Sequence, residues 1–438
     1  MDIDIKSFDK IIHNNRCAFL CGNGFSMNFD TDFGNIYDRL TAANKLVKTK
    51  IVYQTNAQNQ NFARILETNY QAAFNIMVNA NQGQFDSLFE SGIQFADTIL
   101  ESEHIVDILK KEGLINELIF KKSQISLVEL ISEHGHKHGY KSVNIEYWPV
   151  LIYLYFAIKE VKQNYYSCPK DNDFISLIEA GNKYPFPIPS VAKKNKSYIV
   201  CQNVLMNGFN TYYRILFSTA IFCNGKAVCI NDLDKWDSLD INKLKNFLDL
   251  FETIYTLNYD NILENLVKKE IIHLHGKYDE NTHAYVNYQN FGIECNKKWY
   301  DFSDILIGDY FISKGFFNNV ATIQKSNDKI NKAIPKIHEN IDSGLADREI
   351  NTVIIFGLNI NNDQHILRDL MLAFYDQQAE NPKFIYCFWD EDDKKSFQYW
   401  YDASITFRED VSEYVKSIEL LFLGSKDVLK DYFGVMFN

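Results

Sequence analysis

Glycines, amides, carboxylates and imidazoles follow several apolar runs of this chain, where their groups could act on a ligand. The run at residues 17–21 leads into a glycine turn made of Gly22, Asn23, Gly24, Phe25 and Ser26. Such a turn after a strand lets the backbone approach a phosphate, and the next helix offers its N-terminal N–H groups. The third glycine of the dinucleotide-binding fingerprint is missing. The turn therefore fits either a phosphate site or a tight strand–helix connection without a ligand.

A second group of polar residues follows the apolar, β-branched run at residues 251–257. Asn258 and Asp260 then fall at the carboxyl end of a strand, which is where open α/β sheets bind their ligands. Both side chains could instead cap a helix that begins near Asn261. The two roles are compatible, and we favour ligand binding.

A pair of histidines follows the next apolar run. Residues 271–274 predict a short strand with His273 and His275 on one face and Gly276 at the turn. An imidazole at this point could take a proton from a ribose hydroxyl near neutral pH. We favour His275 as the base because it adjoins the glycine turn. Together, these strand ends predict a nucleotide site that contains a general base.

A fourth apolar run, residues 353–356, ends at Gly357 and leads into a polar helix start at residues 361–365. A run without polar residues predicts a strand buried on both faces, as in a parallel sheet. Asp363 is interpreted as a carboxylate at the helix N-terminus in preference to a ribose ligand.

The order of these motifs resembles the sirtuin fold: Gly-x-Gly-Phe-Ser, Thr-x-Asn-x-Asp, Leu-His-Gly, then an apolar strand ending in glycine. The chain looks more closely like the divergent sirtuin-like enzymes of bacterial anti-phage defence. These include the Thoeris-type effectors and the sirtuin-like partners of hexameric ATPases. The residues that carry the resemblance are Gly22, Gly24, Ser26, Thr256, Asn258, Asp260, His275, Gly276 and Gly357.

The resemblance implies an enzyme that cleaves NAD. Asn258 would position the nicotinamide ribose and the attacking water, and His275 would act as the general base. Thr256 and Asp260 would hold the hydrogen-bond network, the first glycine turn would cradle the pyrophosphate, and Gly357 would lie under the adenosine half. The implied NAD-binding residues are Gly22, Asn23, Gly24, Phe25, Ser26, Thr256, Asp260, Gly357 and Asp363.

The chain departs from the protein-deacylating sirtuins in two places. Those enzymes carry a zinc module with two Cys-x-x-Cys pairs, and their glycine loop continues as Gly-Ile-Pro-Asp-Phe-Arg. This chain has eight cysteines but neither feature, so we expect no structural zinc. The departures disfavour a deacylase and leave hydrolysis of the nicotinamide–ribose bond, the reaction of an NAD glycohydrolase that needs no metal.

Three further histidines, His134, His136 and His138, occupy alternate positions. On a strand they would share a face and could bind zinc or nickel. No cysteine ligand stands close by, and the neighbouring glycines are typical of a loop. We therefore expect no metal site there.

Two other classes of function remain open. One is a protein deacylase or ADP-ribosyltransferase, which would need a cleft for a protein substrate. The other is a non-catalytic sensor of NAD or ADP-ribose, although the presence of both Asn258 and His275 argues against a silent site. An effector that destroys NAD during abortive infection must be silent until needed. We therefore expect a homo-oligomer and an activating partner, such as a hexameric ATPase or a phage component.

Composition narrows the class of protein. A chain of 438 residues with 46% hydrophobic and 23% charged residues is typical of a soluble globular protein. Its net charge of −12 disfavours direct nonspecific binding to nucleic acid. The N-terminus lacks signal-peptide character, and the most apolar window, 148–158, is too short to span a bilayer. The spacing of the cysteines shows no disulfide pairing pattern, which is typical of a reducing compartment. We therefore expect a cytoplasmic protein without membrane contact.

The elements that must position these residues predict an α/β fold. Apolar runs alternate with helical patterns after residue 250, as in a parallel sheet with crossover helices. The expected strands are 252–258, 271–275, 352–357, 383–389 and 404–407. We predict a Rossmann-like parallel sheet of sirtuin type, in a nucleotide-binding domain of residues 1–35 and 250–438. Residues 36–249 form a mostly helical insertion, placed to act as a lid or an oligomer contact.

Overall fold

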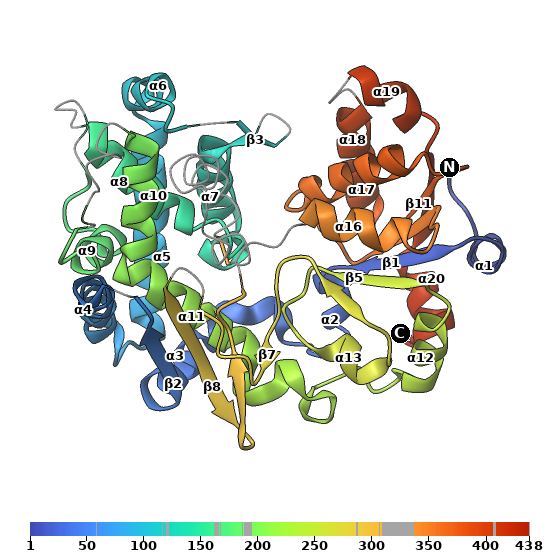
Figure 1. The fold of residues 1–438 in the computed structure, drawn as a ribbon, viewed down its shortest axis with the longest axis horizontal. Coiled ribbons are helices and arrows are strands. Elements are labelled where there is room, and N and C mark those ends of the chain that lie inside the picture. Colours follow the sequence, from blue (N-terminus) through green and yellow to red (C-terminus); the bar gives the residue numbers. More distant parts are fainter. Residues whose placement is uncertain are drawn as a thin grey trace. The chain divides into compact units, whose positions relative to one another are not determined.

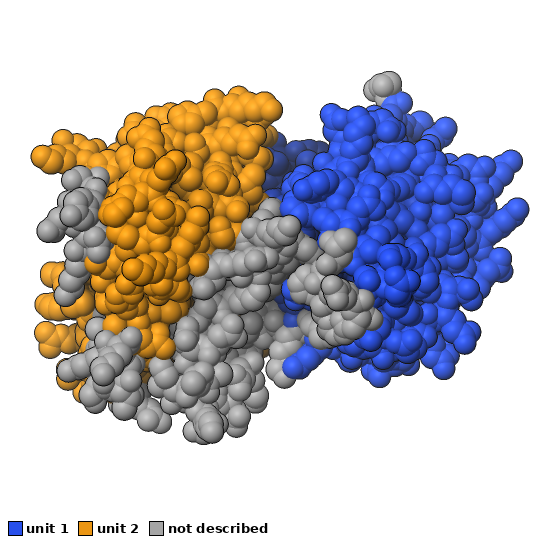
Figure 2. All heavy atoms as spheres, turned by 90° about the horizontal axis from the view of Figure 1, so that it is seen from above, with its two compact units in different colours: residues 1–34, 225–278, 335–438 blue, residues 35–224, 279–334 orange. Residues whose placement is uncertain are grey.

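The computed structural model describes residues 1–57, 59–115, 117–119, 122–161, 166, 168–185, 187, 195–285, 288–305, 307–308, 337–405 and 409–437. The chain forms two compact units, coloured separately in Figure 2. Unit 1 consists of residues 1–34, 225–278 and 335–438, and unit 2 of residues 35–224 and 279–334. These boundaries differ from the expected insertion of residues 36–249. Residues 225–249 belong to unit 1, and residues 279–334 belong to unit 2.

Unit 1 contains a six-stranded sheet with the order β12-β11-β10-β1-β5-β6. Every neighbouring pair is parallel, which confirms the predicted parallel α/β sheet. The strands are β1 (Cys17–Cys21), β5 (Thr253–Thr256), β6 (Ile271–His273), β10 (Thr352–Phe356), β11 (Lys383–Phe388) and β12 (Glu419–Gly424). Starting from β6, their ranks in the sequence are 3-2-1-4-5-6, the doubly wound order of dinucleotide-binding sheets. The order reverses between β1 and β10, where such folds bind their ligands.

Helices lie on both sides of this sheet, with α16 and α17 on one side and α12 and α13 on the other (Figure 1). The helices of unit 1 include α1 (Ile5–Asn14), α2 (Asn23–Ser26), α12 (Ile241–Leu248), α13 (Ile262–Leu266), α16 (Ile337–Ala346), α17 (Gln364–Gln377), α18 (Glu391–Ile405), α19 (Glu409–Val415), α20 (Ser425–Val428) and the short η6 (Leu429–Phe433). Because successive side chains of a strand point to opposite faces, a strand covered on both sides must be apolar throughout. Every residue of β1 and of β10 is accordingly buried.

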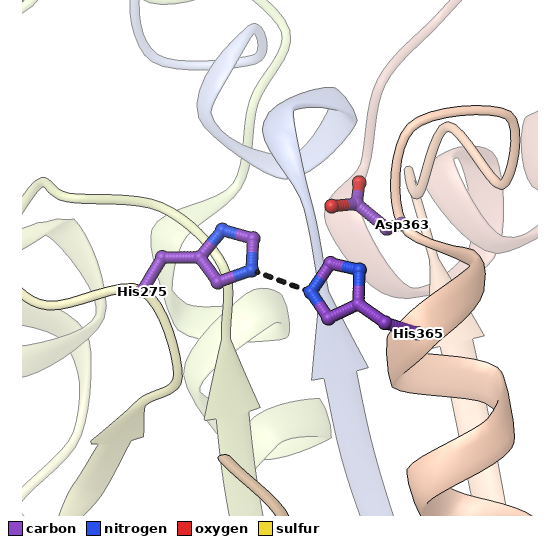
Figure 3. A group of neighbouring side chains, drawn as sticks. All are labelled: His275, Asp363 and His365. Atoms are coloured by element: carbon purple, nitrogen blue, oxygen red, sulfur yellow. Dashed lines mark hydrogen bonds between the residues drawn. The ribbon is translucent and has the colours of Figure 1, made fainter. Parts of the chain in front are cut away.

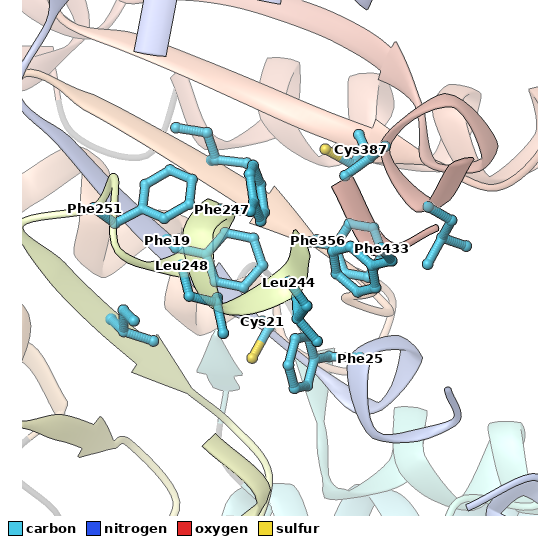
Figure 4. Packing of buried hydrophobic residues seen from close by; sticks show 14 of the residues in the cluster. Phe19, Cys21, Phe25, Leu244, Phe247, Leu248, Phe251, Phe356, Cys387 and Phe433 are labelled. Atoms are coloured by element: carbon cyan, nitrogen blue, oxygen red, sulfur yellow. The ribbon is translucent and has the colours of Figure 1, made fainter. Parts of the chain in front are cut away.

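Aromatic residues fill one face of the sheet (Figure 4). Phe19 of β1 stacks on Phe356 of β10 with ring centroids 6.1 Å apart. Phe247 of α12 meets Phe19 edge-on at 5.7 Å. Phe25 of the first glycine turn meets Phe433 of η6 at 5.9 Å. Burying one Phe side chain contributes about 1.5–3 kcal/mol, so this packing anchors the turn after β1 to the sheet.

Three helices cover the other face. Phe374 of α17 stacks on Phe384 of β11 at 5.3 Å. Tyr386 of β11 donates a hydrogen bond to the backbone carbonyl of Leu358 (3.0 Å), just beyond β10, and its ring faces α18. The hydroxyl of Tyr255 on β5 donates to the backbone carbonyl of Ile341 on α16 (3.0 Å). These contacts fix the strands from which the polar turns emerge.

Unit 2 is mostly helical, and its helix α11 is buried at every residue. Its helices include α3 (Leu40–Thr49), α4 (Gln60–Met77), α5 (Gln82–Leu100), α6 (Glu103–Lys111), α7 (Gln124–His138), α8 (Pro149–Val161), α9 (Asp173–Ala180), α10 (Lys196–Met206) and α11 (Gly208–Phe222). A four-stranded sheet, which the sequence pattern misses, has the order β2-β8-β9-β7. Its strands are β2 (Ile51–Thr55), β7 (Asp279–Glu280), β8 (Gln289–Cys295) and β9 (Lys298–Asp301), and a separate pair is formed by β3 (Glu117–Ile119) and β4 (Lys122–Ser123).

Two sequence predictions about local structure are wrong. A strand is expected at residues 404–407, but residues 404 and 405 are the last two of helix α18. Residues 406 and 407 lie outside the described part of the chain. His134, His136 and His138 lie on α7 and not in a loop. Residues two apart on a helix point in nearly opposite directions, whereas residues four apart share a face. His136 therefore points away from His134 and His138, and the three histidines do not share one face. No helix within the described ranges is long and apolar enough to cross a membrane.

Candidate functional site

The predicted site residues emerge from the carboxyl ends of four neighbouring strands of unit 1. Residues 22–26 follow β1, Asn258 and Asp260 follow β5, His275 follows β6 and Gly357 follows β10. Parallel strands present their carboxyl ends at one edge of the sheet. The fold therefore gathers at one edge residues that are far apart in the sequence.

Asn258 and His275 leave the sheet at the same level. Thr256 of β5 is in register with His273 of β6, and each candidate catalytic residue lies two positions further along. The Leu274 N–H donates to the carbonyl of Thr256 (2.9 Å). The His273 ring lies with Nδ1 2.8 Å from the carbonyl oxygen of Asn258. The two strand ends are thus tied directly to each other.

A buried chain of hydrogen bonds holds the Asn258 amide. Its Nδ2 donates to the carbonyl of Gly22 (3.0 Å) and to Oγ of Ser26 (2.7 Å). The Ser26 hydroxyl donates in turn to Oδ2 of Asp260 (2.6 Å). The Asn258 N–H donates to Oγ1 of Thr256 (3.1 Å). The structure therefore brings together five of the predicted residues in one network.

The other end of the Asn258 amide is unpaired. Its Oδ1 is buried and has no hydrogen-bond partner among the residues that the structure describes. The amide cannot simply be turned over, because the Gly22 carbonyl can only accept a hydrogen bond. A buried acceptor without a partner costs about 1–3 kcal/mol. A donor group on a ligand would remove that cost.

Burial raises the pKa of Asp260 to about 6. Hydrogen bonds from Ser26 and from the Ile262 N–H lower this pKa, and the charge of His273 also lowers it, whereas Glu264 raises it. Near neutral pH the carboxylate is therefore ionised and can only accept. Ser26 must then donate to Asp260, which leaves its oxygen to accept from the Asn258 amide.

The glycine turns after β1 and β10 pack directly against each other. A Cβ atom at Gly24 would lie 2.6 Å from Cα of Gly357, and one at Gly22 would lie 2.7 Å from the Gly357 carbonyl oxygen. The N–H groups of Gly22 and Gly24 donate to the carbonyls of Phe356 and Gly357, each at 3.0 Å. Backbone packing thus accounts for these glycines. The two N–H groups are committed to the protein and do not form the predicted phosphate cradle.

The remaining residues of the first turn have separate roles. The Phe25 ring is fully buried in the aromatic cluster, and its N–H donates to the Gly22 carbonyl (3.0 Å). Asn23 is exposed at the start of α2, which is only four residues long. Phe25 is thus a core residue, because aromatic packing takes up its side chain. Asn23 is free of the core and faces solvent.

His275 has a partner that the sequence analysis missed (Figure 3). Its Nε2 lies 3.2 Å from Nε2 of His365, and the two ring planes are 14° apart. Asp363 lies beside them, and the possible ligand atoms of all three residues are within 4.8 Å of one another. The available signal was the position of His365, in the first turn of the helix that follows β10.

His273 is engaged on both sides of its ring. Besides the contact of Nδ1 with Asn258, its Nε2 lies 2.8 Å from Oε1 of Glu264. Lys277 approaches the same carboxylate oxygen at 3.8 Å. Because both nitrogens face acceptors, His273 ties β6 to α13. The His273 ring is thus committed to contacts within the protein.

The parallel sheet and its strand order make unit 1 an α/β unit consistent with a Rossmann-like fold. No protein-family model, curated protein or solved structure matches the chain significantly. Proteins with this sheet order carry many unrelated activities. The chemistry must therefore be inferred from the residues at the strand ends.

Proposed function

We propose that this protein is a sirtuin-like NAD glycohydrolase, which releases nicotinamide and ADP-ribose. The observation that carries the proposal is the buried Asn258 amide, whose Oδ1 lacks a partner in the described residues. The amide is bonded to the turn that follows β1, next to the place where the strand order reverses. Dinucleotides bind at that place in doubly wound sheets.

In the proposed reaction, water attacks C1′ of the nicotinamide ribose. The bond from C1′ to the nicotinamide nitrogen breaks, and its electron pair leaves with nicotinamide. His275 takes the proton of the water, and His365, with its Nε2 3.2 Å away, can carry that proton onward. The Oδ1 of Asn258 would accept a hydrogen bond from the water or from a ribose hydroxyl.

Ser26 and Asp260 are positioning residues in this scheme. They touch the Asn258 amide through one chain of hydrogen bonds, at 2.7 and 2.6 Å. An ionised Asp260 keeps the Ser26 hydroxyl pointing away from Asn258, and Ser26 then holds Nδ2. The amide is thereby oriented with Oδ1 on its free side.

The glycine turns support NAD binding in a different way from the expected one. Gly22, Gly24 and Gly357 keep side chains away from the strand ends while their backbones pack together. The N–H groups that could hold the pyrophosphate would have to be others than those of Gly22 and Gly24. Asn23, exposed at the start of α2, is our candidate for that contact.

The test is nicotinamide release from NAD by purified full-length protein, beside Asn258→Ala and His275→Ala. We expect each substitution to lower kcat/KM by at least ~100-fold, because each removes a group that acts on the reacting atoms. Asn242→Ala and His13→Ala are matched controls at exposed positions of α12 and α1. Both should keep the wild-type rate.

Each other outcome points to a different function. Release that survives both substitutions would contradict the assignment of the site. NAD binding without any release would favour the non-catalytic sensor. Release that appears only with a protein substrate would favour the ADP-ribosyltransferase or deacylase.

The resemblance to anti-phage effectors supports a role in abortive infection in the cytoplasm. An enzyme that destroys NAD harms its own cell unless it is held inactive. We therefore propose that assembly, alone or with an activating partner such as a hexameric ATPase or a phage component, switches on the activity.

A further inference from the structure

Three side chains with metal-binding atoms converge at the edge of the sheet in unit 1 (Figure 3). His275 follows β6, whereas Asp363 and His365 stand at the start of α17, after β10. The two histidines are 90 positions apart in the sequence, yet their Nε2 atoms face each other. Both rings are buried, and Asp363 is half-buried.

The separation of the two nitrogens suits a shared metal ion. Nitrogen ligands of a tetrahedral zinc ion lie about 2.0–2.1 Å from the ion, which places two of them about 3.3–3.4 Å apart. The observed Nε2–Nε2 separation is 3.2 Å. A hydrogen bond that shares one proton between the rings would have a similar length, so a second observation is needed to favour a metal.

That second observation is the carboxylate of Asp363. Asp363 is the N-cap residue of α17, yet its side chain makes no capping hydrogen bond. An N-cap aspartate commonly accepts a hydrogen bond from the first turn of its helix. Here the carboxylate instead lies within 4.8 Å of both histidine nitrogens.

We propose that His275, His365 and Asp363 form a three-ligand site for a divalent transition-metal ion of the zinc class. Two imidazoles and one carboxylate suit zinc, cobalt and iron, whereas magnesium prefers oxygen ligands. Three protein ligands leave at least one coordination position open, as in catalytic zinc sites. The ion occupies the edge of the sheet beside the strand-order reversal.

The metal site does not depend on the proposed NAD reaction. An ion on Nε2 of His275 uses the lone pair that a general base needs. In a given molecule, His275 therefore either binds the ion or takes a proton. Binding is measured without NAD, so a failed metal test and a failed hydrolysis test are distinguishable.

The experiment is a titration of full-length, tag-free and chelator-treated protein with Co²⁺, followed by the visible d–d absorption of bound cobalt. We expect one Co²⁺ per chain, displaced by Zn²⁺ and unaffected by Mg²⁺. His365→Ala and Asp363→Asn should each weaken Co²⁺ binding. For His365→Ala we expect a loss of at least ~100-fold, since even residues behind the ligands typically matter 10–100-fold.

A matched control uses the other histidine group. The triple variant His134→Ala, His136→Ala and His138→Ala removes the histidines of α7, which could bind metal ions adventitiously. It should bind Co²⁺ as the wild type does. Binding that is lost in the triple variant and kept in His365→Ala would overturn the proposal, as would a wild type that binds neither Co²⁺ nor Zn²⁺.

A variant could lose Co²⁺ binding merely because it folds poorly, so metal binding is also measured by thermal unfolding. A metal ion that binds only the folded state raises the Tm. Zn²⁺ should therefore raise the Tm of the wild type and of the triple variant. It should leave the Tm of Asp363→Asn, which keeps the size of the side chain, nearly unchanged. An equal rise in Tm in Asp363→Asn and the wild type would overturn the assignment of Asp363 as a ligand.

Discussion

Three side chains, Asn258 and Asp260 after β5 and Ser26 after β1, determine one another's hydrogen-bond direction. Asp260 accepts from Ser26, Ser26 accepts from the Asn258 amide, and the amide is left with a buried acceptor. The direction of this chain depends on the charge of Asp260. The stability of the protein should therefore report on that charge.

Asp260 should make the free energy of unfolding fall as the pH rises. Folding raises the pKa of this carboxyl from 3.8 to about 6. Between these values the folded state holds a proton that the unfolded state has lost, so a rising pH favours unfolding. One pKa unit corresponds to about 1.4 kcal/mol, which gives a loss on the order of 3 kcal/mol. Urea unfolding of the wild type and Asp260→Asn across this pH range measures it.

Asp260→Asn cannot ionise, so it should lack this fall in stability. Asp249→Asn, a matched change at an exposed position after α12, should keep the wild-type dependence. If Asp260→Asn followed the wild-type curve throughout the range, the pH dependence would have another origin.

Residue types and their order predict part of the candidate site, and the residues that they fail to predict are missed for physical reasons. Asn258 and Asp260 are recognisable because a polar pair directly follows a buried strand. His365 is missed because its partner His275 is 90 positions away. Phe25 is assigned to NAD binding because of its neighbours, but its ring belongs to the core. Two neighbouring residues can lie in the same turn while their side chains point in different directions.

At the scale of elements, the turns after β1 and β10 interlock. Gly357 has a φ of +63°, and a Cβ there would lie 2.7 Å from Cα of Gly24. Gly113 has a similar φ of +68°, but nothing lies within 4 Å of its missing Cβ. An alanine at Gly113 would therefore cost only the left-handed backbone conformation. An alanine at Gly357 would cost that conformation and also steric crowding.

Gly357→Ala should destabilise the protein more than Gly113→Ala. The left-handed conformation alone costs about 1–2 kcal/mol in an L-residue, which is our expectation for Gly113→Ala. Overpacking adds about 1–3 kcal/mol, so Gly357→Ala should cost about 2–5 kcal/mol in total. Urea unfolding of both variants gives the comparison. Equal losses would mean that the turns can separate without cost.

The strands of the parallel sheet differ in how readily the sequence reveals them. Strands β5, β6, β10 and β11 lie inside ranges that are predicted from apolar runs. Strand β12 (Glu419–Gly424) is not predicted, and a strand is instead expected near residue 404, within α18. Strand length does not explain this miss, because β12 has six residues, as many as β11, whereas the other edge strand, β6, has three.

At the scale of the whole molecule, the chain passes back and forth between two compact units. Unit 1 is assembled from three segments and unit 2 from two. The helical pattern of residues 36–249 marks most of unit 2. It does not show that residues 279–334, with three strands of the four-stranded sheet, return to that unit. Strand pairing over such distances depends on tertiary contacts that local patterns do not encode.

We also expect the whole molecule to self-associate. If assembly switches on NAD hydrolysis, nicotinamide release per chain should rise with protein concentration. The rise should follow the molar mass measured by light scattering, because mass action controls the assembled fraction. Constant activity per chain, over a range in which the protein stays monomeric, would contradict gating by assembly alone.

The sequence by itself determined the features that depend on neighbouring residues. These are the buried strands, the glycine turns that end them and the polar residues that follow, because periodicity and turn chemistry are local. Only the tertiary structure decided which of these residues meet. It placed Gly24 against Gly357 and His275 beside His365 and Asp363. The order of parallel strands in the sheet brings these segments together, and that order is set by packing over the whole unit.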